Sequence, residues 1–249
     1  MIPSSIFIPL VVVLFLFLLF YGRKGRNPEE SESTDYDPIL PATVQNPFVL
    51  PGAEEDAEPH FAFIDVQTNG LIGIDGSVPD ILQIAWIITD KEMNAIKVAN
   101  HYITPSTLGP PSARAVHHIT PEFIRKYGED ENDVMQLFVR ECAKVPHWVM
   151  HNAGFDTQVI LHSCSRNDID PMLSHIILHC TMTYYQRMGI SDEAYESLID
   201  MASQMIGYAP EKLARMDNVA WRNVCLTRVV YRQLTMRHGI DRGFSTEAL

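Results

Sequence analysis

Two aspartates follow apolar stretches that are typical of buried strands, and each stands where a carboxylate could hold a cation. Asp65 lies near the end of the apolar run over residues 61–68, and Gln67 follows two residues later. Because side chains alternate along a strand, both would point to the same face of a sheet. A pair of carboxylates placed in this way would bind Mg²⁺ or Mn²⁺ through oxygen ligands. Here the second position offers an amide, so the pair alone also fits an ordinary polar strand end.

The second aspartate ends the segment HNAGFD, residues 151–156. The pattern predicts a strand that passes through a short polar turn into a helix whose first turn projects Asp156. Such a carboxylate serves either as a metal ligand or as an acid that the helix dipole stabilises. The residues of this segment alone favour neither reading.

A third polar cluster lies in NVAWRNVCLT, residues 218–227, which we predict to be part of one long helix. Asn218 and Asn223 are five residues apart, so they would lie on neighbouring turns of one side of that helix. Buried amides usually have a specific hydrogen-bond partner, and each such group calls for an explanation.

The elements that must position these residues predict an α/β domain. Strands are expected over residues 60–68, 80–90, 95–105 and 174–185, and a strand passing into a helix over 147–164. Short helical turns are expected over residues 108–128, and helices over 131–145, 193–207 and 211–239. Three strands followed by alternating helices and strands indicate a sheet with helices packed on it.

Taken in order, these segments resemble the DEDDh family of 3′–5′ exonucleases, which includes polymerase proofreading subunits and ribonuclease T. Family members open with Asp-x-Glu-Thr-Thr-Gly-Leu, where this sequence has DVQTNGL, and continue to His-Asn-x-x-Phe-Asp, where it has HNAGFD. The last motif is His-x-Ala-x-x-Asp with a Thr four residues on, where NVAWRN and Thr227 stand. The resemblance covers about residues 61–235 and implies a ribonuclease-H-like mixed sheet flanked by helices.

The resemblance also implies a mechanism, in which four acids hold two divalent ions and a histidine deprotonates the attacking water. Asp65 and Asp156 stand at two acid positions and would be the ligands of Mg²⁺ or Mn²⁺. Gln67 stands at the glutamate position, Asn223 at the last aspartate position and Asn218 at the histidine position. Two divalent ions need more compensating charge than two carboxylates supply, and an asparagine amide accepts no proton near neutral pH. We therefore expect weak metal binding at most, no other cofactor, and loss of turnover.

The same resemblance implies a path for a nucleic-acid strand along the first two motifs. The residues expected to line it are Thr68, Asn69, Gly70, Leu71, His151, Asn152 and Phe155. Basic side chains also gather near the C-terminus, among them Lys212, Arg222, Arg228 and Arg232. These either line a phosphate path, lie against anionic lipid or form a solvated helix face.

The N-terminal part is expected to lie outside the domain. Residues 2–21 form an uncharged apolar run, and a bilayer core needs about 20 helical residues. Because the basic cluster GRKGR follows the run, we predict an uncleaved membrane anchor over residues 1–22 with the rest of the chain on the cytoplasmic side. Residues 23–59 are predicted to be a basic flank and a disordered linker, residues 60–240 the exonuclease-like domain, and residues 241–249 a tail.

Charge and cysteine content restrict the partners. The net charge is −12, and residues 60–249 still hold 22 acidic against 16 basic side chains, which argues against strong non-specific binding to nucleic acid. The four cysteines form no CxxC pair, so we expect buried, reduced thiols.

Three functions remain open at this point. The first is a single-pass membrane protein whose exonuclease-like domain has lost catalysis and retains binding of a nucleic-acid 3′ end or a nucleotide. The second is an active metal-dependent 3′–5′ exonuclease with an atypical site. The third is a membrane-tethered scaffold that binds protein partners through the old enzyme fold.

Overall fold

The structure is a computed structural model that describes residue 50 and residues 52–187, 197–207, 209–214 and 218–238. Its described residues form a five-stranded sheet of order β3-β2-β1-β4-β5. The strands are β1 Phe61–Thr68, β2 Ile81–Thr89, β3 Ala95–Tyr102, β4 His147–Met150 and β5 Ile177–Cys180. β2 pairs antiparallel with both β1 and β3, whereas β4 pairs parallel with β1, and β5 pairs parallel with β4. This mixed sheet confirms the predicted ribonuclease-H-like class.

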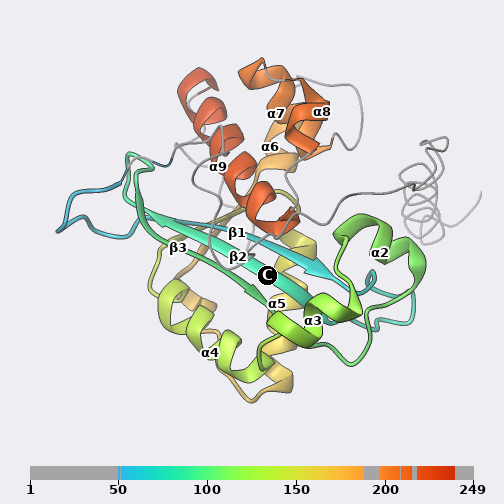
Figure 1. The fold of residues 1–249 in the computed structure, drawn as a ribbon. Coiled ribbons are helices and arrows are strands. Elements are labelled where there is room, and N and C mark those ends of the chain that lie inside the picture. The colour runs from blue at the N-terminus through green and yellow to red at the C-terminus, as the bar shows by residue number, and fades with distance from the viewer. Residues whose placement is uncertain (1–49, 51, 188–196, 208, 215–217, 239–249) are drawn as a thin grey trace, which may run out of the picture.

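Helices cover both faces of the sheet (Figure 1). On one face lie α6 Thr181–Arg187, α7 Leu198–Ile206, α8 Pro210–Ala214 and α9 Val219–His238. On the other face lie α4 Glu131–Cys142 and α5 Ala153–Arg166. The short helices α2 Pro111–His117 and α3 Pro121–Tyr127 lie beyond the end of β1, and a 3-10 turn, η2, spans Leu173–His175.

The two cores explain where the polar residues of β1 point. Phe61 and Phe63 pack into the core under α7 and α9, whereas Ala62 and Ile64 pack into the core with α4 and α5. Because side chains alternate along a strand, Asp65 and Gln67 continue the row of Phe61 and Phe63. Both polar side chains therefore lie on the α9 side of the sheet.

The strand predicted over residues 174–185 is wrong in its second half. Only Ile177–Cys180 is a strand, and α6 begins at Thr181. In α6 the buried residues are Thr181, Tyr184 and Tyr185. Spacings of three and four residues place them on one face of a helix, a pattern that the alternation of a strand does not produce.

The single helix predicted over residues 211–239 is also wrong. The described residues show α8 ending at Ala214 and α9 beginning at Val219, so Asn218 precedes the helix instead of lying inside it. The Oδ1 atom of Asn218 accepts a hydrogen bond from the Trp221 backbone N–H at 3.1 Å. Asparagine is among the preferred residues at this capping position.

Several predicted segments lie outside the described residues, among them the anchor over residues 2–21, most of the linker and the tail over 241–249. No helix in the described part of the chain is both long and apolar enough to cross a bilayer. At the described end of the linker, Leu50 packs on the core and Gly52 forms an isolated bridge with Ala95. All four cysteines are buried and no disulfide joins them, as predicted.

A histidine pair joins β4 and β5: His147 is the first residue of β4, and His179 is the third residue of β5. His147 Nδ1 lies 2.9 Å from His179 Nε2, and His179 Nδ1 lies 2.7 Å from the Tyr184 hydroxyl. Burial, together with smaller electrostatic effects of His147 and His60, lowers the pKa of His179 to about 4. The neutral tautomer that donates from Nε2 and accepts at Nδ1 fits both contacts.

This pair predicts a pH dependence of stability. Below the ordinary histidine pKa of 6.5 the unfolded chain takes up a proton on His179, whereas the folded chain does so only near pH 4. The free energy of unfolding should therefore fall as the pH is lowered from 6.5 to 4. Between pH 7 and 4.5 the full chain should lose about 2 kcal/mol more than the His179→Gln variant, measured by urea unfolding in detergent. Equal losses in the two proteins would contradict this assignment.

Candidate functional site

Two buried aspartates meet at the end of β1. Asp65 comes from β1 and Asp156 from the first turn of α5, and their exposed fractions are 7% and 4%. Burial raises the pKa of Asp65 to about 7, against the lowering effect of hydrogen bonds from Gln67 and Asn223. Burial also raises the pKa of Asp156 well above its ordinary value, and the neighbouring Asp65 charge raises it further. The pair therefore carries less than two full negative charges at neutral pH.

Two side-chain amides surround Asp65. Gln67 Nε2 donates to Asp65 Oδ2 at 2.8 Å, and Asn223 Nδ2 donates to Asp65 Oδ1 at 3.2 Å. Each carboxylate oxygen thus accepts a hydrogen bond from one amide N–H. The structure brings Asp65, Gln67, Asp156 and Asn223 together, as the sequence motifs predict.

Arg222 orients the second of these amides. Its Nε and Nη2 atoms both lie 3.1 Å from Asn223 Oδ1, and its Nη1 atom lies 3.4 Å from the Ala214 carbonyl oxygen. The Asn223 oxygen is thereby used by the guanidinium, which leaves its N–H groups for Asp65. Burial lowers the pKa of Arg222, and the charge of Asp65 opposes this effect.

Asn218 lies beside this cluster and is engaged by Gln83 of β2. Gln83 Nε2 donates to Asn218 Oδ1 and, at 2.7 Å, to Asn100 Oδ1. Gln83 Oε1 accepts from the Ala220 backbone N–H at 3.3 Å. Gln83 is also the residue paired with Gln67 in the sheet register. Neither amide is a base near neutral pH, so this pair supplies hydrogen bonds and no proton acceptor.

Two residues of the site escaped the sequence analysis. Gln83 is the single polar residue of the first eight in β2, a strand that is buried throughout, and this exception was its signal. Arg222 was grouped with basic residues of a phosphate path or a solvated helix face. The solvated-face interpretation is wrong for Arg222, and also for Arg228, which is buried and donates to the Met93 carbonyl oxygen at 2.6 and 2.9 Å.

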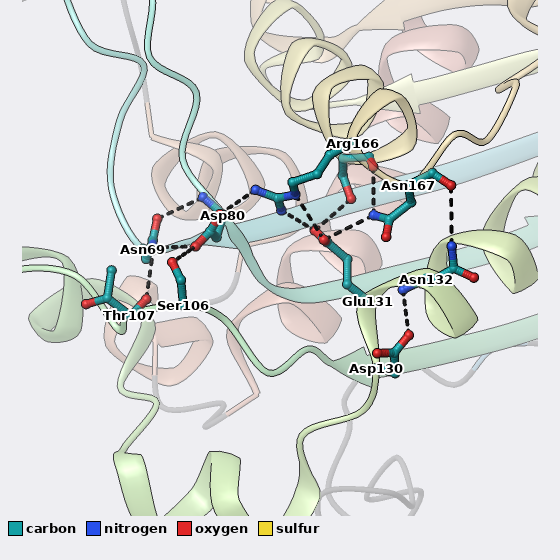
Figure 2. A network of polar contacts seen from close by, with 10 residues as sticks. Asn69, Asp80, Ser106, Thr107, Asp130, Glu131, Asn132, Arg166 and Asn167 are labelled. Atoms are coloured by element: carbon teal, nitrogen blue, oxygen red, sulfur yellow. Dashed lines mark hydrogen bonds and ion pairs between the residues drawn. The ribbon is translucent and has the colours of Figure 1, made fainter.

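Asn69, predicted to contact nucleic acid, forms hydrogen bonds to its own loop and to the segment after β3 (Figure 2). Its Nδ2 donates to the Thr107 carbonyl oxygen at 2.8 Å and to Asp80 Oδ2 at 3.2 Å, and its Oδ1 accepts from the Asp80 backbone N–H at 2.9 Å. Gly109 lies against it: a Cβ there would lie 1.8 Å from the Asn69 carbonyl oxygen, and φ is +73°. Asn69 therefore shapes the loop that follows β1.

The same network ties this loop to α5 (Figure 2). Arg166, in the last turn of α5, donates to Asp80 Oδ1 at 2.7 Å and to Glu131 Oε2 at 3.1 Å, and Ser106 Oγ donates to Asp80 at 2.6 Å. Burial tends to raise the pKa of Asp80, but these bonds outweigh it and the pKa lies below its ordinary value. Since α5 also carries Asp156, one network fixes both halves of the site.

The other predicted contact residues of the first motif flank Asn69. Thr68 and Gly70 are half-buried, and Thr68 Oγ1 donates to the Gly70 carbonyl oxygen at 2.7 Å. Leu71 is 49% exposed and is one of several exposed large apolar side chains among the described residues.

The residues of the second motif lie where β4 passes into α5. His151 Nδ1 lies 3.0 Å from Thr181 Oγ1, and Asn152 is exposed at the helix start. Phe155 is half-buried and packs on the core beneath α5. These residues are near Asp156 in sequence, so their positions agree with a shared surface around the two carboxylates.

The residues around Asp65 do not fit a pair of divalent ions in their present arrangement. Such ions require oxygen ligands, and the two amides next to Asp65 present N–H groups to it. Within the described residues, no group of three or more His, Cys, Asp or Glu side chains could hold a metal ion.

Comparisons with known proteins identify the family. A sequence model described as exonuclease matches residues 62–205, more than half of the chain, a range that includes Asp65 and Asp156 and ends before Asn218. No curated protein matches the sequence.

Solved structures of Escherichia coli exonuclease I share the fold. The complex with a dA16 oligonucleotide is 22% identical with a TM-score of 0.59, covering 73% of this chain and 42% of that one. The complex with dT13 is 21% identical with a TM-score of 0.58, with the same coverage. The likeness therefore spans less than half of exonuclease I. The match of the family model shows that the chain belongs to the DEDDh-type exonuclease family, and the shared fold agrees with it.

Proposed function

We propose that this protein binds a nucleic-acid 3′ end or a nucleotide without cleaving it. The observation that carries the proposal is the pair of amide N–H bonds, from Gln67 and Asn223, on the two oxygens of Asp65. By the family resemblance, both amides stand where carboxylates would complete a metal site. Both oxygens of Asp65 thus have hydrogen-bond donors from the chain itself.

Charge supports this proposal. Two divalent ions bring four positive charges, and a two-metal mechanism needs ligands that balance them. Asp65 and Asp156 supply at most two negative charges, and burial raises the pKa of both. Metal binding would also have to displace both amide hydrogen bonds of Asp65. Weak Mg²⁺ or Mn²⁺ binding is the most that this set of ligands supports.

The second support is the missing base. Asn218 stands at the histidine position of the resemblance, and its oxygen accepts hydrogen bonds from Gln83 and from the Trp221 backbone N–H. Positioned proton transfer contributes roughly 10²–10⁴ in rate, which an amide does not supply. The loss of this base adds to the loss of metal charge.

Nucleic-acid binding is proposed from the family and from the surface around the site. The exonuclease I structures hold dA16 and dT13 oligonucleotides. In this chain Leu71, six residues after Asp65, and Asn152, four residues before Asp156, are both exposed. Because the folded part is acidic, binding should be weak and sensitive to salt.

One observation favours an active enzyme as the second candidate, namely that both Asp65 and Asp156 are present and close together.

The decisive test uses the full chain, purified in detergent, with 5′-labelled single-stranded DNA and RNA in the presence of Mg²⁺ or Mn²⁺. We expect no shortening of either strand and a fluorescence-anisotropy change that decreases with salt.

Two outcomes would contradict the proposal. Metal-dependent shortening that Asp65→Ala abolishes would establish an active exonuclease. Absence of both shortening and binding would remove the nucleic-acid role and leave the protein-interaction scaffold.

Restoring the missing groups should restore chemistry. The triple change Gln67→Glu, Asn218→His and Asn223→Asp adds two carboxylates and a base at the positions that the resemblance assigns. We expect detectable metal-dependent shortening of single-stranded DNA or RNA, at least about 10²-fold above the unchanged protein. A triple variant that folds, binds Mn²⁺ and remains inactive would contradict the assignment of these positions.

We also propose that residues 2–21 anchor the protein in a membrane with the exonuclease domain on the cytoplasmic side. The uncharged run and the basic residues after it support this placement. Removing residues 1–22 should move the protein from the carbonate-resistant membrane pellet to the soluble fraction. An unchanged distribution would contradict the anchor.

A further inference from the structure

We propose that Arg222 excludes metal from this site in two ways. Its positive charge takes the place of a divalent ion near Asp65, and its hydrogen bonds hold Asn223 in an orientation that cannot coordinate a metal. The inference rests on the proposed function, from which it takes the site without working metal ions. It adds the residue that keeps the ions out. Arg222 lies within the third motif, at a position for which the motif specifies no residue type.

The orientation of Asn223 follows from the hydrogen bonds of its side-chain amide. Asn223 Oδ1 accepts from two nitrogens of Arg222, each at 3.1 Å, and Asn223 Nδ2 donates to Asp65 at 3.2 Å. Turning the amide over would place its oxygen against the Asp65 oxygen and its N–H groups against the guanidinium N–H groups. Three hydrogen bonds would be replaced by two repulsive contacts, because a guanidinium has no acceptor and a carboxylate no donor.

A metal ion needs the orientation that Arg222 forbids. Only the oxygen of an asparagine side chain coordinates a hard cation. While Arg222 holds that oxygen, Asn223 presents N–H groups to the place where a cation would sit beside Asp65. Asn223 is therefore excluded as a ligand by its own chain neighbour.

The charge of Arg222 acts in the same direction. An arginine keeps its positive charge in proteins, and this one lies near enough to Asp65 to lower the pKa of that carboxyl. The site is buried, so a divalent ion would meet this charge across a medium that screens it less than water does. A cation that belongs to the chain thus disfavours a second cation from solution.

The inference changes what restoring a carboxylate at position 223 should do. An aspartate there would meet the Arg222 Nε and Nη2 atoms that now bond to the Asn223 oxygen. Arginine and carboxylate pair through two parallel hydrogen bonds, which are among the strongest in proteins. The restored carboxylate would then form an ion pair with Arg222, which would leave it less available to coordinate a metal ion.

The test measures Mn²⁺ affinity by calorimetry in the full chain carrying Gln67→Glu, Asn218→His and Asn223→Asp. Adding Arg222→Met to this background should tighten Mn²⁺ binding about tenfold or more. The matched control is Arg232→Met, which removes an exposed arginine from the same helix and should leave the affinity unchanged. Equal Mn²⁺ affinity with and without Arg222 would overturn the inference.

A second variant and a second readout guard against misfolding. Arg222→Gln keeps a polar side chain without the charge and should give the same tightening. The melting temperature of either variant should rise with Mn²⁺ by more than that of the chain retaining Arg222; an equal rise would overturn the inference. Tight binding of two Mn²⁺ ions by the unchanged protein would overturn the proposed function together with the inference, whereas equal affinity with and without Arg222 overturns the inference alone, so the two failures are distinguishable.

Discussion

The hydrogen bonds on Asp65 are the interaction on which this account depends. A buried carboxylate must find partners, since leaving it without them costs several kcal/mol. In a metal-dependent site the partner is a cation from solution. Here Gln67 and Asn223 each supply an N–H, and Arg222 supplies a nearby positive charge. The carboxylate is thus accommodated by groups of the chain itself.

The fold places these groups without depending on what they coordinate. β1 runs through the middle of the sheet, so the alternation that buries Phe61 and Phe63 also sends Asp65 and Gln67 toward α9. The network around Asp80 and Arg166 ties the loop after β1 to α5, and α9 packs over the same end (Figures 1 and 2). Apolar packing and this polar network therefore position the residues of the site together.

The same separation of packing and chemistry explains what the sequence could and could not predict. The strand through Asp65 and the turn before Asp156 were predictable, because alternation and a polar turn mark them. The start of α9 directly after Asn218 was missed, because residues 211–239 keep a helical apolar pattern throughout and an asparagine at a cap cannot be told from an interior one by its type. Arg222 was missed as a site residue because its role depends on the neighbour that it orients, which only the three-dimensional contacts identify.

The most direct measurement is anomalous diffraction at the manganese edge from crystals of the protein grown with Mn²⁺. The account predicts no anomalous peak within coordinating distance of Asp65, with the Gln67 and Asn223 amides still donating to its carboxylate. Two well-occupied Mn²⁺ ions between Asp65 and Asp156, with the amides turned away, would contradict it.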